Sequence, residues 1–469
     1  MLTSVDRACL HHRRQQLADW VEDPVLLWSG TSVSRNFAAN RFPFRASSHF
    51  LYFAGMPLQN AVIGLAAGQL TLFWDEPSPE STVWHGPSLS RRDVAEQMGA
   101  DDHLPLSAVP TWTLAVATLP APTADSLQQQ TEWLGRSVSG SGSGHPQEWD
   151  RHMERDHQLA QAIIRLRLQQ DDFALTQLQQ AAQITVEAHL QGMRSTLNHA
   201  SEAALRAEIE SVMMAHQCPT AYTSIVTVQG EILHNDIYPH TFAPGDLLLV
   251  DAGAETPLGW AADVTRTWPV SGHFSATQRD LYDIVLAAHD ACIAQIAPGV
   301  EFRDVHLLAA QTIASGLVDV GILRGQPEDL VERDAHALFF PHGIGHLLGL
   351  DVHDMEDLGD GAGYEPGRQR CDRMGLRYLR LDRPLCSQML VTIEPGFYQI
   401  PALLHNPDLR QQYRDCVNWD RLAQFEDVRG IRIEDDVLVT SEGSQVLTSA
   451  LPTQADDVMA CVNSTSLKE

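Results

Sequence analysis

Four acidic residues end or interrupt apolar, β-like runs in the second half of the chain, and they constrain the fold more than any other sequence feature. Asp251 ends LLLVDAG, Asp263 lies in AADVTRTW, Glu394 lies in LVTIEPGFY and Glu434 lies in IRIEDDVLV. A single carboxylate beside a strand is often a turn former or an edge residue. Four buried carboxylates, however, repel one another and lose their hydration unless a cation compensates them. The pattern therefore predicts strands that end at a shared metal centre.

The stretch FFPHGIGHLLGLDVHD, residues 339–354, contains three histidines, His342, His346 and His353. The first two are four residues apart, but Gly-Ile-Gly lies between them, so the glutamate of a helical H-E-x-x-H zinc motif is missing and helix propensity is low. The glycines favour an extended or turning backbone that a ligand can approach closely. A lone histidine in an apolar run is more often a core residue than a ligand, but three so close together favour a site.

One imidazole added to the four carboxylates gives a mixed ligand set. Such a set suits Mn²⁺, Co²⁺, Zn²⁺ or Fe²⁺ rather than a metal that requires thiolates. Five protein ligands exceed the needs of one tetrahedral zinc, whereas two metals that share bridging carboxylates would use all five. We therefore expect a two-metal centre.

The chain of 469 residues is longer than a usual single domain, and a Ser/Gly run divides it. RSVSGSGSGHP, residues 136–146, cannot contribute to a core, so we expect a domain boundary close to it. Residues 1–150 alternate short apolar runs with helix-like segments and predict a mixed α/β domain. Residues 151–469 predict an α+β domain.

Apolar spacing predicts individual elements on both sides of this boundary. The N-terminus fits an amphipathic helix rather than a signal peptide, and residues 61–74, AVIGLAAGQLTLFW, fit a β-hairpin. Helices are expected near residues 150–195, 200–217, 276–296 and 302–320. The β-like runs TSIVTVQG, GDLLLVDAG, QMLVTIEPGFY and IRIEDDVLVT are expected to form an antiparallel sheet.

Composition argues against several classes of partner. Sixty acidic against 32 basic residues give a net charge of −28, which repels nucleic acids and anionic membranes and supports solubility. Seven cysteines without a C-x-x-C pair provide neither a disulfide framework nor a zinc-knuckle signature. A reducing cytoplasm fits this cysteine pattern best.

The succession VDAGAE, AADVTRT, PHGIGHLLGLDVHD, TIEPGFY and GIRIEDD resembles the M24B metallopeptidases, which have the pita-bread (creatinase/aminopeptidase) fold. Within them it resembles the proline-specific members, Xaa-Pro dipeptidase (prolidase) and aminopeptidase P. The resemblance covers residues 156–450 closely and the N-terminal domain more loosely. It implies two divalent metals, most simply Mn²⁺ with Co²⁺ or Zn²⁺ as alternatives. Asp263 and Glu434 would bridge them, Asp251 would bind one metal, and His346 and Glu394 would bind the other.

The same resemblance places His234, His342 and His353 around the substrate, where an imidazole can donate to a carbonyl or transfer a proton. Arg432 would belong to the substrate-binding residues and would also orient the carboxylate of Glu434. The implied reaction is attack of an activated water on an Xaa-Pro carbonyl. Glu394 would relay the proton to the proline nitrogen, and His353 would polarise the carbonyl.

Substrate length distinguishes the two proline-specific activities. Arg380 matches the prolidase arginine that pairs with a dipeptide carboxylate, although a solvated role on its charged loop stays open. The segment between Glu394 and Glu434 also resembles a prolidase insertion, whereas RFPFRASSHFLYFAGM resembles aminopeptidase P. The expected function is therefore prolidase, with aminopeptidase P as the alternative.

Trp84 matches an aromatic residue that the family places near a neighbouring subunit's site, which would imply a homodimer or homotetramer; a plain core tryptophan is the alternative. Three further classes rank lower. A methionine aminopeptidase would not normally carry the preceding domain, and an inactive pita-bread binding module would normally lack some of the ligands. Phosphoester hydrolysis would call for a phosphate-binding loop, which the sequence lacks.

Overall fold

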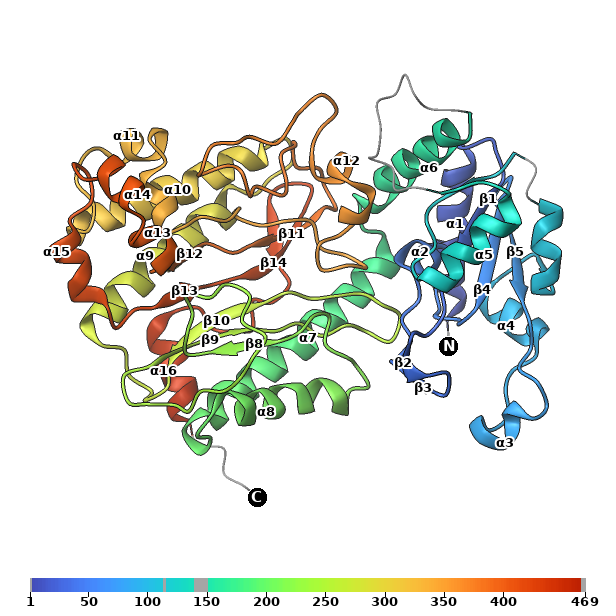
Figure 1. Ribbon diagram of the computed structural model, residues 1–469, viewed down its shortest axis with the longest axis horizontal. Coiled ribbons are helices and arrows are strands. Elements are labelled where there is room, and N and C mark those ends of the chain that lie inside the picture. The colour runs from blue at the N-terminus through green and yellow to red at the C-terminus, as the bar shows by residue number, and fades with distance from the viewer. Residues whose placement is uncertain (1, 113–114, 139–150, 465–469) are drawn as a thin grey trace. The chain divides into compact units, whose positions relative to one another are not determined.

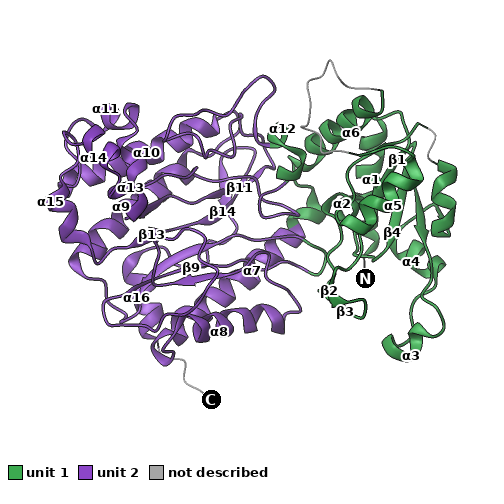
Figure 2. Cartoon of the chain, viewed as in Figure 1, with its two compact units in different colours: residues 1–175, 257–259, 355–362 green, residues 176–256, 260–354, 363–469 purple. Residues whose placement is uncertain are grey.

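The computed structural model describes residues 2–112, 115–138 and 151–464, which belong to two compact units (Figure 2). Unit 1 comprises residues 1–175, 257–259 and 355–362, and unit 2 comprises residues 176–256, 260–354 and 363–469. Most of the Ser/Gly run, residues 139–146, lies outside the described residues. Helix α6 (Arg151–Arg167) packs against α1 (Ser4–Ala18) and β7 (Ala117–Thr118) of unit 1. Unit 1 thus extends to Leu175, beyond the expected boundary at residue 150, and includes α6 and the start of α7.

Unit 1 contains a mixed five-stranded sheet in the order β6-β5-β4-β1-β7. β4 (Ala61–Ala66) and β5 (Gln69–Trp74) pair antiparallel along their whole length, as the predicted hairpin requires. β1 (Val25–Trp28) is antiparallel to β4 and parallel to β7, and β6 (Asp102–Leu104) is parallel to β5. Unit 1 also contains α2 (Ser48–Ala54), α3 (Ser81–His85), α4 (Arg91–Met98), α5 (Ala124–Leu134) and the hairpin β2 (Ser34–Phe37) with β3 (Asn40–Arg41).

The predicted N-terminal helix is α1, which begins at a capping box. The side chain of Thr3 accepts the N–H of Asp6, and the carboxylate of Asp6 accepts the N–H of Thr3. Leu10 and Leu17 are buried on one side of the helix, as expected for an amphipathic helix.

Unit 2 contains three small antiparallel sheets rather than the single sheet that the sequence suggested. The first has the order β10-β9-β8, the second β11-β14-β15, and the third pairs β12 with β13. Their bounds are β8 Ile225–Thr227, β9 Leu247–Asp251, β10 Thr265–Pro269, β11 Leu390–Ile393, β12 Gly396–Tyr398, β13 Gly430–Arg432, β14 Asp435–Val439 and β15 Ser444–Val446.

The second and third sheets form one ribbon that is interrupted at two acidic residues. Ile393 pairs with Asp435 in one sheet, and Gly396 pairs with Arg432 in the other. Between them the strands break at Glu394-Pro395 and at Ile433-Glu434, because proline cannot donate to the ladder. The N–H of Glu434 bonds to the carbonyl of Thr265, so this break lies against β10.

Register in the first sheet brings two more acidic residues to the same place. Asp251, the last residue of β9, pairs with Thr265, the first residue of β10. Asp263 lies two residues before β10 and therefore comes close to Asp251 in space. Each acidic residue of the predicted centre thus lies at a strand end.

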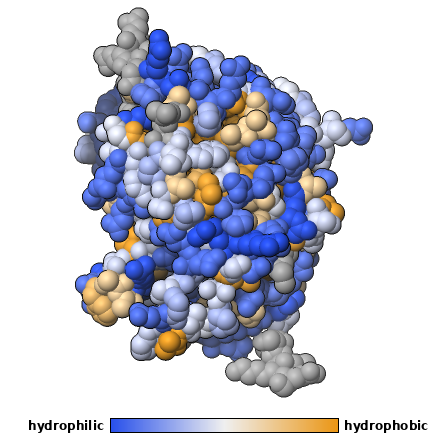
Figure 3. All heavy atoms as spheres, turned by 90° about the vertical axis from the view of Figure 1, so that its right-hand side faces the viewer, coloured by the Kyte–Doolittle hydropathy of each residue, from blue (hydrophilic) through white to orange (hydrophobic). Residues whose placement is uncertain are grey.

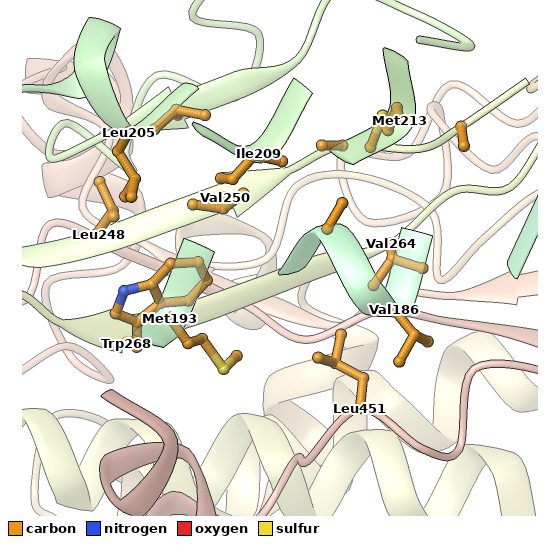
Figure 4. Close-up of a cluster of buried hydrophobic side chains, with 14 of the residues drawn as sticks. Val186, Met193, Leu205, Ile209, Met213, Leu248, Val250, Val264, Trp268 and Leu451 are labelled. Carbon is orange, nitrogen blue, oxygen red and sulfur yellow. The ribbon is translucent and has the colours of Figure 1, made fainter. Parts of the chain in front are cut away.

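Helices cover these sheets (Figure 1). α7 (Asp172–Ser195), α8 (Glu202–Ala215) and α16 (Ala455–Asn463) share one hydrophobic core with β9 and β10. Figure 4 shows Trp268 of β10 in this core, near Met193 of α7 and Leu451. α9 (Ala276–Gln295) contacts β11, β12 and β13, and α10 (Phe302–Asp319) packs on α9. The remaining short helices are α11 Pro327–Glu332, α12 Asp360–Gly363, α13 Pro401–Leu404, α14 Pro407–Gln412 and α15 Trp419–Leu422.

One face of the molecule is largely polar, in agreement with the acidic composition. The face in Figure 3 is mostly hydrophilic, with hydrophobic side chains in small separate patches. None of the helices in the described part of the chain combines the length and the apolar character that a bilayer crossing requires.

Candidate metal centre

A cavity of about 410 Å³ lies in unit 2, at the strand ends where the acidic residues meet. All ten residues that the sequence assigned to a site in this half of the chain line it: His234, Asp251, Asp263, His342, His346, His353, Arg380, Glu394, Arg432 and Glu434. Trp84 lies in unit 1 on α3 and is 82% exposed, so the alternative of a buried core tryptophan is wrong.

Asp263, His346 and Glu434 form the tightest part of the centre. Each offers a ligand atom within 4.8 Å of the others, and all three side chains are buried. Nε2 of His346 lies 3.4 Å from Oδ2 of Asp263 and 3.7 Å from Oε1 of Glu394. Carboxylate and imidazole groups gathered at these distances fit a divalent metal.

Local backbone contacts fix the orientation of His346. Its N–H bonds to Oγ1 of Thr392, and its carbonyl accepts the N–H of Thr392. A Cβ on Gly345 would lie 1.9 Å from the Thr392 carbonyl, so only glycine permits this close approach. Nδ1 of His346 lies 3.0 Å from the Leu347 carbonyl, and a proton there leaves Nε2 to face the carboxylates as a ligand.

Burial and mutual repulsion shift the acidic groups away from their ordinary behaviour. Burial raises the pKa of Asp251 to about 6 and that of Glu394 to about 7. Burial and the negative charges of Asp263 and Glu394 raise the pKa of Glu434. The charged forms are therefore costly without a cation, and a pair of divalent ions would remove that cost. The donor set thus fits the two metals that the sequence predicted.

Asp263 and His346 behave as a pair. Burial alone would raise the pKa of Asp263, but the hydrogen bond and charge of His346 lower it. Burial alone would lower the pKa of His346, but its contacts with Asp263 and Glu394 raise it. Of the five candidate ligands, Glu394 is the most exposed to solvent, with an 18% exposed side chain.

Arg432 contacts one candidate ligand directly and a second one through a threonine. Its Nη2 donates to Oδ2 of Asp251 at 2.6 Å, and its Nε donates to Oγ1 of Thr265 at 2.9 Å. The hydroxyl of Thr265 in turn donates to Oε2 of Glu434 at 2.7 Å. Arg432 is thus linked to Glu434 through the hydroxyl of Thr265, and it contacts Asp251 directly.

Sequence reasoning missed Tyr222. Its hydroxyl lies 2.5 Å from Oδ1 of Asp251 and 2.6 Å from Oδ1 of Asp263. Burial and the charge of Asp251 raise its pKa, so it stays a neutral donor beside both carboxylates. Neither Tyr222 nor Thr265 carries a local sequence signal, because their roles depend on residues far away in the chain.

The three remaining histidines differ in their surroundings. Nε2 of His342 lies 2.8 Å from the hydroxyl of Tyr398, and Nδ1 lies 2.8 Å from the Gly343 carbonyl, so both ring nitrogens already have protein partners. Burial lowers the pKa of His342 to about 3 and, with Arg432, also lowers that of His234. The ring of His353 packs edge-on against His346, with 4.5 Å between the centroids. At neutral pH, His234 and His342 are therefore uncharged.

Comparison with known proteins agrees with this architecture. The family model "Metallopeptidase family M24" matches residues 176–441, and the model "Aminopeptidase P, N-terminal domain" matches residues 10–118. A probable Xaa-Pro aminopeptidase of Tuber melanosporum is 30% identical over 97% of this chain and 94% of its own length. A probable Xaa-Pro aminopeptidase of Emericella nidulans is 32% identical over 87% of this chain and 86% of its own length.

Solved structures are similar along the whole chain. Aminopeptidase PepP of Pseudomonas aeruginosa has a TM-score of 0.78 and 27% identity, and the match covers 97% of this chain and 98% of that one. Aminopeptidase P of E. coli with the inhibitor Pro-Leu has a TM-score of 0.77 and 26% identity, covering 98% of this chain and 99% of that one. The strands, the centre and these matches agree with the predicted α+β pita-bread fold, and the chain belongs to metallopeptidase family M24 and is a metal-dependent exopeptidase.

Proposed function

We propose that the protein is an Xaa-Pro aminopeptidase, which removes the first residue from peptides that have proline in second position. The complete set of five predicted ligands around one cavity carries this proposal. Relatives named Xaa-Pro aminopeptidase, which match most of the chain, support it. They favour this activity over the dipeptidase function that the sequence analysis ranked first.

The ligand set assigns a role to each acidic residue. Asp251, Asp263, His346, Glu394 and Glu434 would hold two divalent ions, and Mn²⁺ is our proposed choice for this mixture of carboxylates and one imidazole. Such ions, when bound, acidify water and polarise a carbonyl oxygen. Arg432 and Tyr222 hold Asp251 through their contacts with its two oxygens. These contacts fix ligand geometry.

Other residues of the chain would act on the substrate. Glu394, the most exposed of these ligands, would take a proton from the attacking water and return it to the proline nitrogen. His353 and His234 line the cavity and would each donate a hydrogen bond to the peptide, His234 as a neutral imidazole. His342, with both ring nitrogens engaged, would act as a positioning residue that fixes Gly343 and Tyr398.

Prolidase activity stays the second candidate because Arg380 lines the cavity. It lies close enough to His234 to contribute to the lowering of the pKa of His234, after burial and Arg432. A guanidinium there can pair with the carboxylate of a dipeptide. This observation favours dipeptides, whereas the comparisons favour longer peptides.

A series of substrate lengths separates the two activities. The purified protein, loaded with Mn²⁺, is given Ala-Pro, Ala-Pro-Ala and Ala-Pro-Ala-Ala, and released alanine is measured. An aminopeptidase gives higher kcat/KM for the two longer peptides. Preference for Ala-Pro would reject our proposal and support prolidase. The variant Glu394→Gln serves as the inactive control.

We also propose that Trp84 contributes to contacts between copies of the chain, as a homodimer or homotetramer. The side chain of Trp84 is 82% exposed, so a large apolar surface contacts water. Association with a second copy of the chain would cover this surface. Light scattering of the wild type and of Trp84→Ala tests this. A monomeric wild type would contradict it. A cytoplasmic location stays a prediction.

A further inference from the structure

One segment of unit 2 carries a charge opposite to that of the whole chain. Residues 364–383, YEPGRQRCDRMGLRYLRLDR, contain six arginines against three acidic residues, although the net charge of the protein is −28. We refer to this segment as the arginine loop. It supplies Arg370, Tyr378 and Arg380 to the wall of the cavity.

Two arginines of this loop serve its own structure. Arg368 donates to Glu301 at 2.6 Å and to the buried Asp382 at 2.9 Å, and Arg303 also pairs with Asp382. Arg373 pairs with Asp334 at 2.8 Å. These ion pairs hold the loop to the body of unit 2.

Arg370 is positioned by different contacts. Its guanidinium lies over the ring of Tyr364, 5.3 Å from the centroid, and its Nη1 lies 3.3 Å from the Leu379 carbonyl. The hydroxyl of buried Tyr364 donates to the same carbonyl at 2.7 Å. Arg370 is therefore an exposed residue of the cavity wall, and these contacts hold its guanidinium in one orientation.

The loop also packs directly on the histidine-rich stretch. A Cβ on Gly343 would lie 3.1 Å from Cα of Leu379 and from the Tyr378 carbonyl. The backbone next to His342 thus supports the backbone that presents Tyr378 and Arg380. The wall that the loop forms is fixed relative to the metal centre by this contact and by the ion pairs.

We propose that Arg370 and Tyr378 bind the carboxyl-terminal part of short peptides, so that the preferred substrates are tripeptides and tetrapeptides with a free terminal carboxylate. This inference rests on the proposed aminopeptidase function and specifies its substrate class. Arg380 lies near His234, while Arg370 and the 58% exposed Tyr378 lie at the opening. A guanidinium pairs with a carboxylate, and the tyrosine ring offers apolar contact to the residue before it.

Size and charge both support this assignment. A cavity of about 410 Å³ belongs to the lower part of the range found for small-ligand sites, so a peptide soon reaches the opening. A positive wall in a strongly acidic protein also attracts an anionic peptide end over other parts of the surface.

The test compares Ala-Pro-Ala with its C-terminal amide, which lacks the carboxylate. We expect the wild type to have about five-fold higher kcat/KM for the acid, the size expected for an exposed ion pair. Arg370→Gln should remove most of this preference without change in bound Mn²⁺. Tyr378→Ala should raise KM for both peptides to a similar extent. Arg377→Gln is the matched control for charge, because Arg377 is an exposed arginine of the same loop that is not among the described residues lining the cavity and approaches Tyr378 only at 6.0 Å from its ring centroid.

Three outcomes would overturn the inference, and they differ in what they say about the function. Equal rates for acid and amide in the wild type would reject the carboxylate site while aminopeptidase activity stands. Equal loss of preference in Arg370→Gln and Arg377→Gln would mean that general charge rather than a site selects the acid. Cleavage of Ala-Pro without cleavage of either tripeptide would reject both the inference and the proposed function.

Discussion

The two sides of the cavity are built in opposite ways. The metal side consists of buried carboxylates at strand ends, whereas the loop side consists of the exposed Arg370 and Tyr378 and the half-buried Arg380 on an irregular segment. On the metal side each charge depends on the others, because a buried carboxylate without a partner is costly. On the loop side the guanidinium of Arg370 is exposed, so its charge can be removed at little cost to stability. Substitutions should therefore have large effects on one side and small, substrate-dependent effects on the other.

The largest effect is expected from removal of a shared ligand. Glu434→Ala should lower kcat/KM by about a thousandfold or more, because the loss of a proposed metal ligand would remove several kcal/mol of transition-state stabilisation. Activity and bound metal should fall together. Glu442→Gln, an exposed carboxylate on the following turn, should leave both unchanged. Full activity with normal metal content in Glu434→Ala would contradict the assignment.

Two glycines separated by one residue allow the two sides to be compared directly. Gly345→Ala would place Cβ 1.9 Å from the Thr392 carbonyl and displace His346, so metal should be lost and activity should fall about a hundredfold. Gly343→Ala meets the arginine loop at 3.1 Å and should raise KM for tripeptides only a few-fold. Metal analysis and kinetics of both variants check this contrast. Loss of metal in Gly343→Ala would show that the two sides are not separable.

Removal of the buried cation should have an intermediate effect. Arg432→Met removes the cationic partner of Asp251 and leaves it the hydroxyl of Tyr222, so activity should fall about ten- to a hundredfold. Without metal, the unfolding free energy of this variant should be about 3 kcal/mol lower than that of the wild type. Arg414→Met, which removes a 62% exposed guanidinium whose partner Asp415 is 74% exposed, should cost less than about 1 kcal/mol. Chemical denaturation of both variants measures the difference.

The smallest effect is the pH dependence of stability in the metal-free protein. Because the pKa values of Asp251 and Glu394 are raised to about 6 and 7, the folded state binds more protons than the unfolded state between about pH 4 and 7. Their contribution to stability therefore falls as pH rises through that window. Buried His189, His306 and His336, whose pKa is lowered to about 4, act in the opposite direction, because the unfolded state binds their protons first.

The difference between metal-loaded and metal-stripped protein isolates the carboxylates, since the buried histidines contribute to both forms. Protons compete with metal for Asp251 and Glu394, so the rise in Tm caused by Mn²⁺ should grow from pH 5 to pH 8. Thermal unfolding with and without EDTA measures it. A gain that is independent of pH would contradict the raised pKa values.

The contrast between the two sides also explains which predictions succeeded. Asp251, Asp263, Glu394 and Glu434 stand out in the sequence because a charge within an apolar strand requires compensation. Buried His306 and His336 have no comparable carboxylate cluster around them, and only the surroundings distinguish them from His346. Arg370 and Tyr378 had no signal, because exposed arginines and tyrosines occur throughout a soluble protein.

The sequence by itself indicated the main β-like runs and helical regions of the second half, the five candidate ligands of the centre and the family. Periodicity and buried charge are local properties that one segment reveals alone. Only the tertiary structure decided that Tyr222 lies between Asp251 and Asp263 and that Arg432 contacts Asp251. It also divided the loop arginines into structural and cavity-lining groups. These partners are far apart in the chain, and a hydrogen bond depends on register and side-chain direction, which are set only when the strands pair.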